Sequence, residues 1–283
     1  MKRRHLLKTL GVGCLGLSVA PKIFATTTRG YFAGSVYSSD EGLKDYLQKI
    51  HNFNKPHDDD VQLDHSLYQT FVSTVMRLRR LQKLVGHGNF NILNFTDGLS
   101  LAANYPKVGE FTKEELKFLE NVFYEDGQRY GFLGQKPIKE ITEQVKKKDV
   151  VKIPYSGNYL YKERSIALFE EIKKELGDQV ILTSGIRSIM KQFLLFLNKV
   201  YESEGNLSLA SRSLAPPGYS FHGNGDFDVG QRGYGKLNFT GSFTETEVYK
   251  RLAELGYLKL RYPQGNRLGV RYEPWHIKIN VNA

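Results

Sequence analysis

The 283-residue sequence predicts an α+β protein with a small, mainly antiparallel sheet, flanking helices and a helical N-terminal region. In the second half of the chain, short β-type segments alternate with amphipathic helices, without the regular repeat of strand, helix and strand that builds a parallel sheet. Before residue 150, apolar residues recur mainly at helical spacing. We therefore expect an export signal over residues 1–25, a helical region of unknown role over 26–150, and a domain with the candidate site over 151–283.

The first 25 residues have the pattern of an export signal. Basic residues near the start precede an apolar stretch over residues 10–20, and Ala25 offers a small residue for cleavage. The pair Arg3-Arg4 resembles a twin-arginine signal, with an ordinary secretory signal as the alternative. Because the apolar stretch is too short for a membrane span, we expect a mature chain without one, in the periplasm or outside the cell.

The composition of the mature chain excludes some classes of function. Residues 1–25 hold five lysines and arginines and no acidic residue, so the mature chain keeps +5 of the net charge of +10. This charge suits an acidic polymer such as the cell wall, but no basic patch interleaved with aromatics indicates nucleic acid. The single cysteine, Cys14, would leave with the signal.

The region before residue 150 is predicted to contain four helices. They cover residues 41–53, 66–85, 113–124 and 138–147. Gly86 is placed to end the second helix, and Thr112 with Glu115 forms a capping box for the third. Residues 89–107 are polar and are predicted to be irregular.

The region after residue 155 is predicted to mix both kinds of element. Helices are expected over 163–176, from Ser188 to about 201, and from a cap at Thr244 to Gly256. Strands are expected over 179–183, up to Val229, and over 257–262 and 275–281. A tight turn, Ser184 to Arg187, links the first of these strands to the second helix.

Two stretches of the last quarter carry the residue types of a zinc hydrolase. His222 lies in a glycine-rich turn and is followed by Asp226 and Asp228, while Glu273 precedes His276 by three residues. Catalytic zinc takes three protein ligands from His and Asp or Glu, and a nearby carboxylate then serves as general base. The sequence therefore predicts a zinc site in this part of the chain.

Strand alternation turns His276 away from the apolar face of its segment. Trp275, Ile277 and Ile279 share that face, so His276 and Lys278 lie on the other. Pro274 has no amide hydrogen, so the strand is expected to begin after it and to leave Glu273 able to turn back over the metal. A buried structural histidine is the alternative for His276.

These stretches resemble a known family. Residues 216–230 (PPGYSFHGNGDFDVG) and 272–279 (YEPWHIKI) are similar to motifs of the zinc D-alanyl-D-alanine carboxypeptidases of the vancomycin-resistance type, which share a fold with hedgehog domains and lysostaphin-like endopeptidases. TSGIRS at 183–188, APPGYS at 215–220 and LRYP at 260–263 also fit, so the resemblance covers about residues 155–281. It implies a hedgehog/D,D-peptidase-like fold for the catalytic domain.

The resemblance also implies roles for individual residues. His222 and His276 would bind zinc together with Asp228, Glu273 would be the general base, and Arg187 would face the scissile carbonyl and bind substrate. Ser220 would contact the substrate. Gln192 and Arg261 are weaker candidates on the substrate side, outside the catalytic set.

One aspartate departs from the family pattern. The family usually has its aspartate seven positions after the histidine, which here is Val229. A deletion of one residue in the loop would make Asp228 the ligand, whereas the spacing of the lysostaphin-like relatives would select Asp226. The aspartate that is not a ligand would support a histidine or lie on the surface.

The function implied is that of an exported zinc metallopeptidase that acts on peptidoglycan stem peptides and removes a terminal D-alanine. A murein endopeptidase that cuts cross-links is one alternative. A non-catalytic wall-binding protein with a degenerate site is the other.

Overall fold

The computed structural model describes residues 40–279 and confirms the α+β class. The predicted export signal, Cys14 and the end of the last predicted strand lie outside these residues. Within residues 40–279, no helix is long and apolar enough to cross a membrane.

The helices and strands follow one another in a mixed order. The helices are α1 (Asp40–His51), α2 (Tyr68–Val85), α3 (His87–Phe90), α4 (Phe95–Asn104), α5 (Lys113–Tyr124), α6 (Ile166–Leu176), α7 (Ile189–Glu202), α8 (Leu207–Ser211) and α9 (Glu247–Glu254). The strands are β1 (Val150–Lys152), β2 (Tyr159–Tyr161), β3 (Val180–Ser184), β4 (Phe227–Gln231) and β5 (His276–Ile277).

The strands form two small antiparallel sheets. β1 and β2 make a hairpin, and β3, β4 and β5 make a sheet with β4 in the centre. In this sheet Asp228 pairs with Ser184 on one side and with His276 on the other. The register therefore places Asp228 and His276 directly beside each other.

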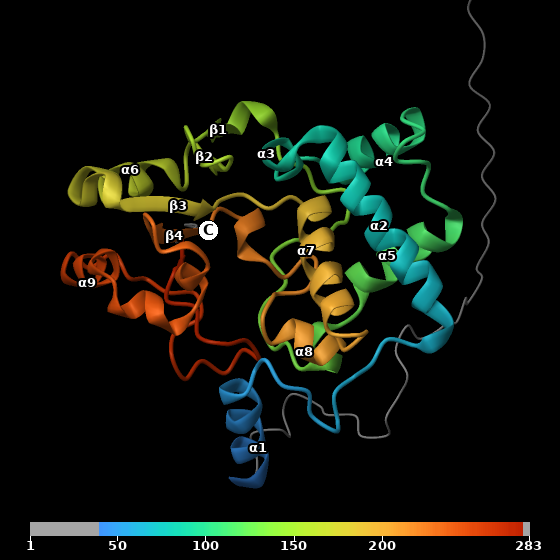
Figure 1. Ribbon diagram of the computed structural model, residues 1–283, viewed down its shortest axis with the longest axis horizontal. Helices are drawn as coiled ribbons and strands as arrows, with labels where there is room; N and C mark the ends of the chain where they lie inside the picture. Colours follow the sequence, from blue (N-terminus) through green and yellow to red (C-terminus); the bar gives the residue numbers. More distant parts are fainter. Residues whose placement is uncertain (1–39, 280–283) are drawn as a thin grey trace, which may run out of the picture.

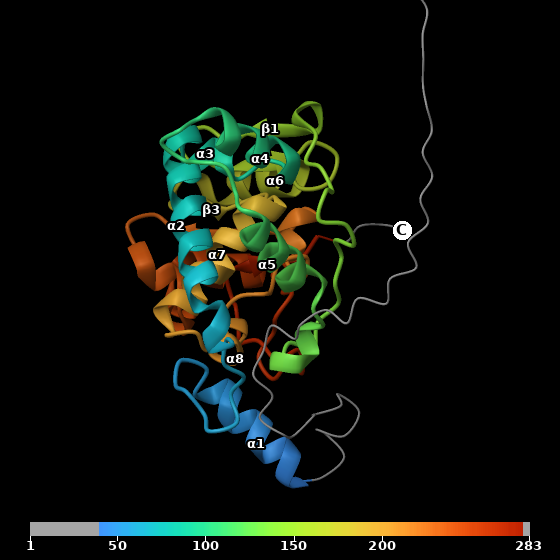
Figure 2. The ribbon, with the colours of Figure 1, turned by 90° about the vertical axis from the view of Figure 1, so that its right-hand side faces the viewer.

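Helix α7 separates a helical side of the molecule from the side that carries the sheet (Figure 1). α2, α4 and α5 lie on one side of α7, and β3, β4, α6 and α9 lie on the other (Figures 1 and 2). The largest core cluster joins apolar side chains of α2, α4 and α5 to those of α7 and α8. Phe193 of α7, for example, has its ring centroid 6.2 Å from that of Phe95 and 6.5 Å from that of Phe123. A second cluster lies under the sheet, between α6 and α9.

Several predicted helices form as expected because a capping residue precedes an amphipathic run. Thr112 and Glu115 make the capping box of α5. Ser188 accepts a hydrogen bond from the backbone N–H of Lys191 at the start of α7. α1 and α2 also match the predicted helices closely, and α2 ends at Gly86 as expected.

Other expected elements differ. Residues 89–107 were expected to be irregular, but α4 forms there because Phe95 and Ala102 are buried in the main core. The expected helix over residues 138–147 is absent from the described chain, and Ile138 and Ile141 enter the core from a non-helical segment. α9 is capped by Thr246 instead of Thr244. The expected strands over 257–262 and 275–281 shorten to an isolated bridge at Leu260 and to β5.

Candidate metal centre

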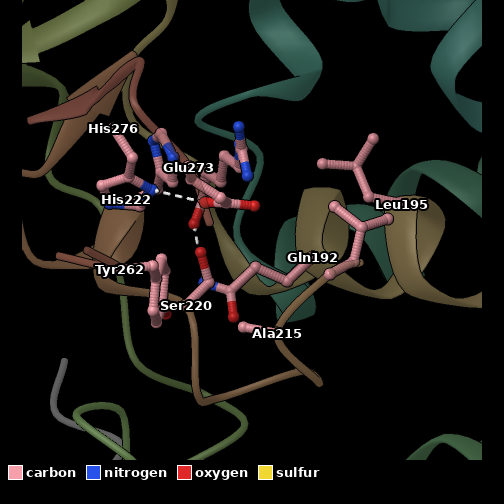
Figure 3. A pocket seen from close by; sticks show the side chains of 10 residues that line it. Gln192, Leu195, Ala215, Ser220, His222, Tyr262, Glu273 and His276 are labelled. Carbon is pink, nitrogen blue, oxygen red and sulfur yellow. Dashed lines mark hydrogen bonds and ion pairs between the residues drawn. The ribbon is translucent and has the colours of Figure 1, made fainter. Parts of the chain in front are cut away.

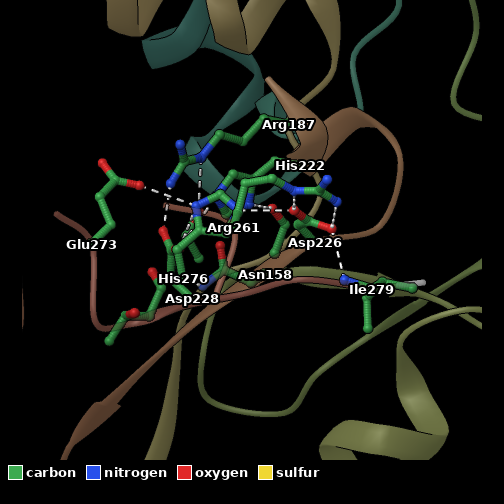
Figure 4. Close-up of polar contacts among 12 residues, drawn as sticks. Asn158, Arg187, His222, Asp226, Asp228, Arg261, Glu273, His276 and Ile279 are labelled. Carbon is green, nitrogen blue, oxygen red and sulfur yellow. Dashed lines mark hydrogen bonds and ion pairs between the residues drawn. The ribbon is translucent and has the colours of Figure 1, made fainter. Parts of the chain in front are cut away.

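Three side chains predicted to bind zinc meet in the structure. His222, Asp228 and His276 each offer one ligand atom, and these atoms lie within 4.8 Å of one another. His222 comes from a short 3-10 helix after the Ser220 turn, Asp228 from β4 and His276 from β5. All three side chains are buried. Figure 4 shows them among their polar partners.

Two of the three distances between ligand atoms in this group fit a tetrahedral zinc ion. Nε2 of His222 lies 3.3 Å from Oδ1 of Asp228, and Nδ1 of His276 lies 3.5 Å from the same oxygen. Zinc bonds of 2.0–2.2 Å in tetrahedral geometry place neighbouring ligand atoms about 3.3 to 3.6 Å apart. Both Nε2 of His222 and Oδ1 of Asp228 are buried and lack a hydrogen-bond partner in the described part of the chain. Since buried polar atoms without a partner are costly, a metal ion is a fitting partner for these two.

The tautomer of His222 suits a ligand. Its Nδ1 lies 2.8 Å from the carbonyl oxygen of Gly185, so Nδ1 carries the proton and donates it to this oxygen. The lone pair of Nε2 then faces the group. Burial and the nearby Arg187 lower the pKa of His222, and both favour the neutral imidazole that binds metal.

Asp226 supports His276 from behind the group. Its Oδ2 lies 3.0 Å from Nε2 of His276, which leaves Nδ1 facing Asp228. Asp226 also accepts hydrogen bonds from Nε and Nη2 of Arg261, at 2.7 and 3.0 Å, and from the backbone N–H of Ile279 at 2.8 Å (Figure 4). Burial opposes the charge of His276, but its bonds to Asp226 and Glu273 raise its pKa to about 9. Without metal this ring is therefore protonated at neutral pH, and zinc would have to displace the proton on Nδ1. A carboxylate in this position fixes the ring and increases its basicity.

The two aspartates therefore have different places in the structure. Asp228 belongs to the candidate metal group, and Asp226 contacts a histidine of that group from outside. This arrangement agrees with the assignment made from the deletion and not with the lysostaphin-like spacing. Arg261, expected on the substrate side, instead pairs with Asp226 and lies over the ring of Phe221 at 3.7 Å.

Glu273 lies at the edge of the metal group. Its Oε2 is 3.2 Å from Nδ1 of His276, and its backbone N–H bonds the carbonyl of Tyr262. The side chain lines both cavities described below (Figure 3). The predicted general base is thus beside the ligand atoms and faces the space that a substrate would enter.

Arg187 has a contact that the sequence did not predict. Its Nη2 donates to Oδ2 of Asp228 at 2.6 Å, and its Nε donates to Oγ of Ser184 at 2.9 Å. The guanidinium, together with the two histidines, outweighs burial and holds the pKa of Asp228 well below its usual range. Arg187 therefore fixes one oxygen of Asp228 and leaves the other for the metal, while the side chain still lines both cavities.

Two cavities meet at the metal group. A small pocket of about 20 Å³ is bordered by Ser220, Gln192, Ala215 and Tyr262 (Figure 3). A larger cleft of about 460 Å³ runs past α3, the β1–β2 turn, α7 and Trp275. Arg187, Leu195, Leu214 and Glu273 line both of them.

The small pocket contains Gln192, a weaker substrate-side candidate from the sequence, and Tyr262, which was not a candidate. Gln192 accepts a hydrogen bond from the backbone N–H of Gly218 at 2.9 Å and donates one to the carbonyl of Arg187 at 2.8 Å, so it ties the Ser220 loop to the Arg187 turn. The ring of Tyr262 packs edge-on against His276, with centroids 5.2 Å apart. Tyr262 lies in the LRYP stretch, which was the available signal. Ser220 is buried and lines the small pocket, and its contact with substrate stays a prediction.

Comparison with known proteins places this site in a family. A family model described as VanY, D-alanyl-D-alanine carboxypeptidase, matches residues 160–280, which include every predicted site residue. No curated protein gives a match to the sequence.

Solved structures give distant similarities. A structure of the LdcB LD-carboxypeptidase is 23% identical over 54% of this chain and 77% of the other, with a TM-score of 0.41. A vancomycin-resistance D,D-pentapeptidase VanY variant in complex with Zn(II) is 25% identical over 53% of this chain and 87% of the other, with a TM-score of 0.39. A third, VanYB in complex with D-alanine-D-alanine, is 24% identical over 53% and 84%, also with a TM-score of 0.39. The match to the VanY D-alanyl-D-alanine carboxypeptidase family covers residues 160–280, which is less than half of the chain.

Proposed function

We propose that the protein is an exported zinc metallopeptidase that removes the terminal D-alanine from peptidoglycan stem peptides. The observation that carries this proposal is the meeting of Nε2 of His222, Oδ1 of Asp228 and Nδ1 of His276, with the carboxylate of Glu273 beside them. The family match over the same residues supports the substrate class.

Each residue around the group has a proposed task. A zinc ion held by His222, Asp228 and His276 would supply a Lewis acid and a water of lowered pKa. Glu273 would act as general base toward the attacking water and as general acid toward the leaving amine. Arg187 keeps Asp228 charged and lies where it also stabilises the developing negative charge of the scissile carbonyl oxygen.

The size of the small pocket supports a carboxypeptidase over an endopeptidase. A volume of about 20 Å³ holds about one water molecule by the same measure, so a chain that continues past the scissile bond has no room on this side of the metal group. Cutting a cross-link would require room for chain on both sides of the scissile bond. The complete ligand set speaks against a degenerate, purely wall-binding site.

Export is proposed from the N-terminal sequence alone. Basic residues, the pair Arg3-Arg4 and the apolar stretch that follows them support a twin-arginine type signal. Removal of this signal would place the protein in the periplasm or outside the cell, with the substrate.

The test is to incubate the purified protein with a muropeptide that ends in D-alanyl-D-alanine and with a cross-linked muropeptide, with zinc and after chelation. Mass spectrometry should show loss of one alanine, abolished by the chelator and restored by zinc. Cleavage of the cross-link alone would indicate the endopeptidase, and no product from either with zinc bound would contradict a peptidase.

A further inference from the structure

The larger cleft contains cationic side chains that the protein itself does not neutralise. Arg187, Lys191 and Arg271 line it, and the acidic residues that line it are Asp228 and Glu273. Asp228 is paired with Arg187, and Glu273 contacts His276 at the metal group. Lys191 and Arg271 therefore have no ion-pair partner among the residues that line the cleft.

Lys191 has no fixed partner. It lies in the first turn of α7, and its ammonium makes no hydrogen bond or ion pair with any residue from 40 to 279. Burial and the nearby Arg187 lower the pKa of Lys191 to about 8. A half-buried cation without a counter-charge is unfavourable, and an anionic ligand would relieve it.

Arg271 is held in position, but one of its hydrogen-bond donors has no partner in the described chain. Its guanidinium carbon lies 4.9 Å from the ring centroids of both Phe53 and Trp275, and Nη1 donates to the carbonyl of Phe239 at 3.2 Å. Its Nε is buried and has no hydrogen-bond partner in the described chain. Asp228 and Glu273 are near enough to favour the charge, but neither forms an ion pair with it. A guanidinium fixed in this way is preorganised to bind a carboxylate.

We propose that Lys191 and Arg271 bind a side-chain carboxylate of the substrate on the amino-terminal side of the scissile bond. This inference rests on the proposed function and specifies its substrate class. Of the two cavities, only the larger cleft of about 460 Å³ has room for several residues, so the peptide on the amino-terminal side of the scissile bond is placed there. An acidic residue in the stem peptide is then favoured over an amidated one.

The position of Lys191 beside Arg187 narrows the choice of residue. Lys191 lies in the first turn of α7, and its charge is near enough to that of Arg187 for the two to repel. Because Arg187 lies at the metal group, a carboxylate bound by Lys191 belongs to a residue close to the scissile bond. The residue before that bond is D-alanine, whose side chain is a methyl group, so the carboxylate is assigned to the residue that precedes D-alanyl-D-alanine.

The test compares two peptides that differ only in that residue. Both end in D-alanyl-D-alanine preceded by diaminopimelate, whose side-chain carboxylate is free in one peptide and amidated in the other. Hydrolysis is measured with the zinc-loaded protein, and binding is measured by calorimetry with the Glu273→Gln variant. Lys191→Met and Arg271→Gln are the test substitutions, and Lys199→Met, on the same helix but outside the cleft, is the matched control.

We expect the free acid to be preferred by about 10- to 100-fold in KM and in Kd, the range typical of a charge-assisted hydrogen bond. Lys191→Met should remove most of this preference with little change toward the amidated peptide, and Lys199→Met should leave it intact. Equal binding of the two peptides, or an equal loss for both in Lys191→Met, would overturn the inference. If neither peptide is hydrolysed, the proposed function fails, whereas the calorimetric comparison still decides the carboxylate site.

Discussion

At the scale of single residues, Asp226 and Asp228 are two positions apart but have different partners. Asp228 shares its Oδ1 with two histidine nitrogens, while Asp226 holds the far nitrogen of His276 and pairs with Arg261. We expect Asp228→Ala to lose zinc and Asp226→Ala to lose only about 10- to 100-fold in zinc affinity, because an outer partner orients a ligand but does not replace it.

Metal analysis of the two purified variants provides the measurement. Both substitutions remove a buried carboxylate from neighbouring positions, so each is the control for the other. Zinc that remains in Asp228→Ala but is lost from Asp226→Ala would reverse the assignment.

A substitution at Glu273 can distinguish the role of metal binding from the role of proton transfer. The substitution Glu273→Gln keeps the shape of the side chain and leaves the three ligands in place, but an amide cannot accept a proton. We expect unchanged zinc content and a loss of about 10²- to 10⁴-fold in kcat. Near-normal turnover of a terminal D-alanine by this variant would remove Glu273 from the mechanism.

At the scale of elements, the turn between β3 and α7 is fixed from two sides. The backbone N–H of Ile186 bonds the carbonyl of Tyr159 in β2, and the carbonyl of Gly185 accepts from His222. A Cβ on Gly185 would overlap the carbonyl oxygen of Tyr159, and both atoms belong to backbone that is held in place.

Gly185→Ala should therefore destabilise the protein by about 1–3 kcal/mol, the usual cost of overpacking, and should also lower zinc affinity through His222. Gly241→Ala is the control, because a Cβ there would meet nothing within 4 Å. Urea unfolding of both variants measures the effect. Equal midpoints would mean that the turn is not constrained as described.

Elements could be predicted from the sequence where a local signal was sufficient. The caps at Thr112 and Ser188 and the apolar faces of α2 and α7 are local, and these helices were predicted correctly. α4 was missed because Asp97 and Gly98 are typical of a loop, although Phe95, Leu99 and Ala102 recur at helical spacing and pack in the shared core. Gly98 itself lies against Met190 there. β5 is shorter than predicted because its pairing depends on β4, a neighbour that alternation within one segment does not reveal.

For the candidate site, the sequence indicated the residues that converge but not the ion pairs that hold them. The ligand types and their motifs are visible in the sequence, so His222, Asp228 and His276 could be chosen before their convergence was known. The pairing of Arg187 with Asp228 and of Arg261 with Asp226 depends on side-chain directions across segments 41 and 35 residues apart. No local pattern contains this information.

At the scale of the whole molecule, a buried ion pair connects the helical side to α8. Asp60 bonds both Nη atoms of Arg212, at 2.6 and 2.8 Å, and both side chains are buried. Burial opposes the charge of Asp60, but its bonds to Arg212, to the backbone N–H of His57 and to Asn206 give a net lowering of its pKa. The folded state therefore binds this proton less readily than the unfolded state, whose pKa is about 3.9.

This ion pair should stabilise the protein above about pH 4 and progressively less as the pH falls through the lower, folded-state pKa. Asp60→Asn should cost about 3–5 kcal/mol at neutral pH, because Arg212 then stays buried without its counter-charge. The difference between wild type and variant should shrink below pH 4. Unfolding midpoints from pH 3 to 7 test this, with the exposed Asp58→Asn as control, and a difference that does not vary with pH would contradict it.

The core that joins α7 to α2, α4 and α5 predicts how the two parts of the chain depend on each other. The division near residue 150 remains a prediction, but Phe193, Phe196, Leu197 and Val200 of α7 are buried in one cluster with side chains from before that point. Exposing each such side chain to water costs about 1.5–3 kcal/mol. The sum over several of them approaches the whole free energy of unfolding of a typical domain, which is about 5–15 kcal/mol. We expect a fragment of residues 151–283 to lack cooperative unfolding and to bind a hydrophobic dye, whereas a fragment of residues 40–283 unfolds in one transition. A sharp thermal transition in the shorter fragment, with zinc bound, would mean that the sheet and its site fold independently of the helical region.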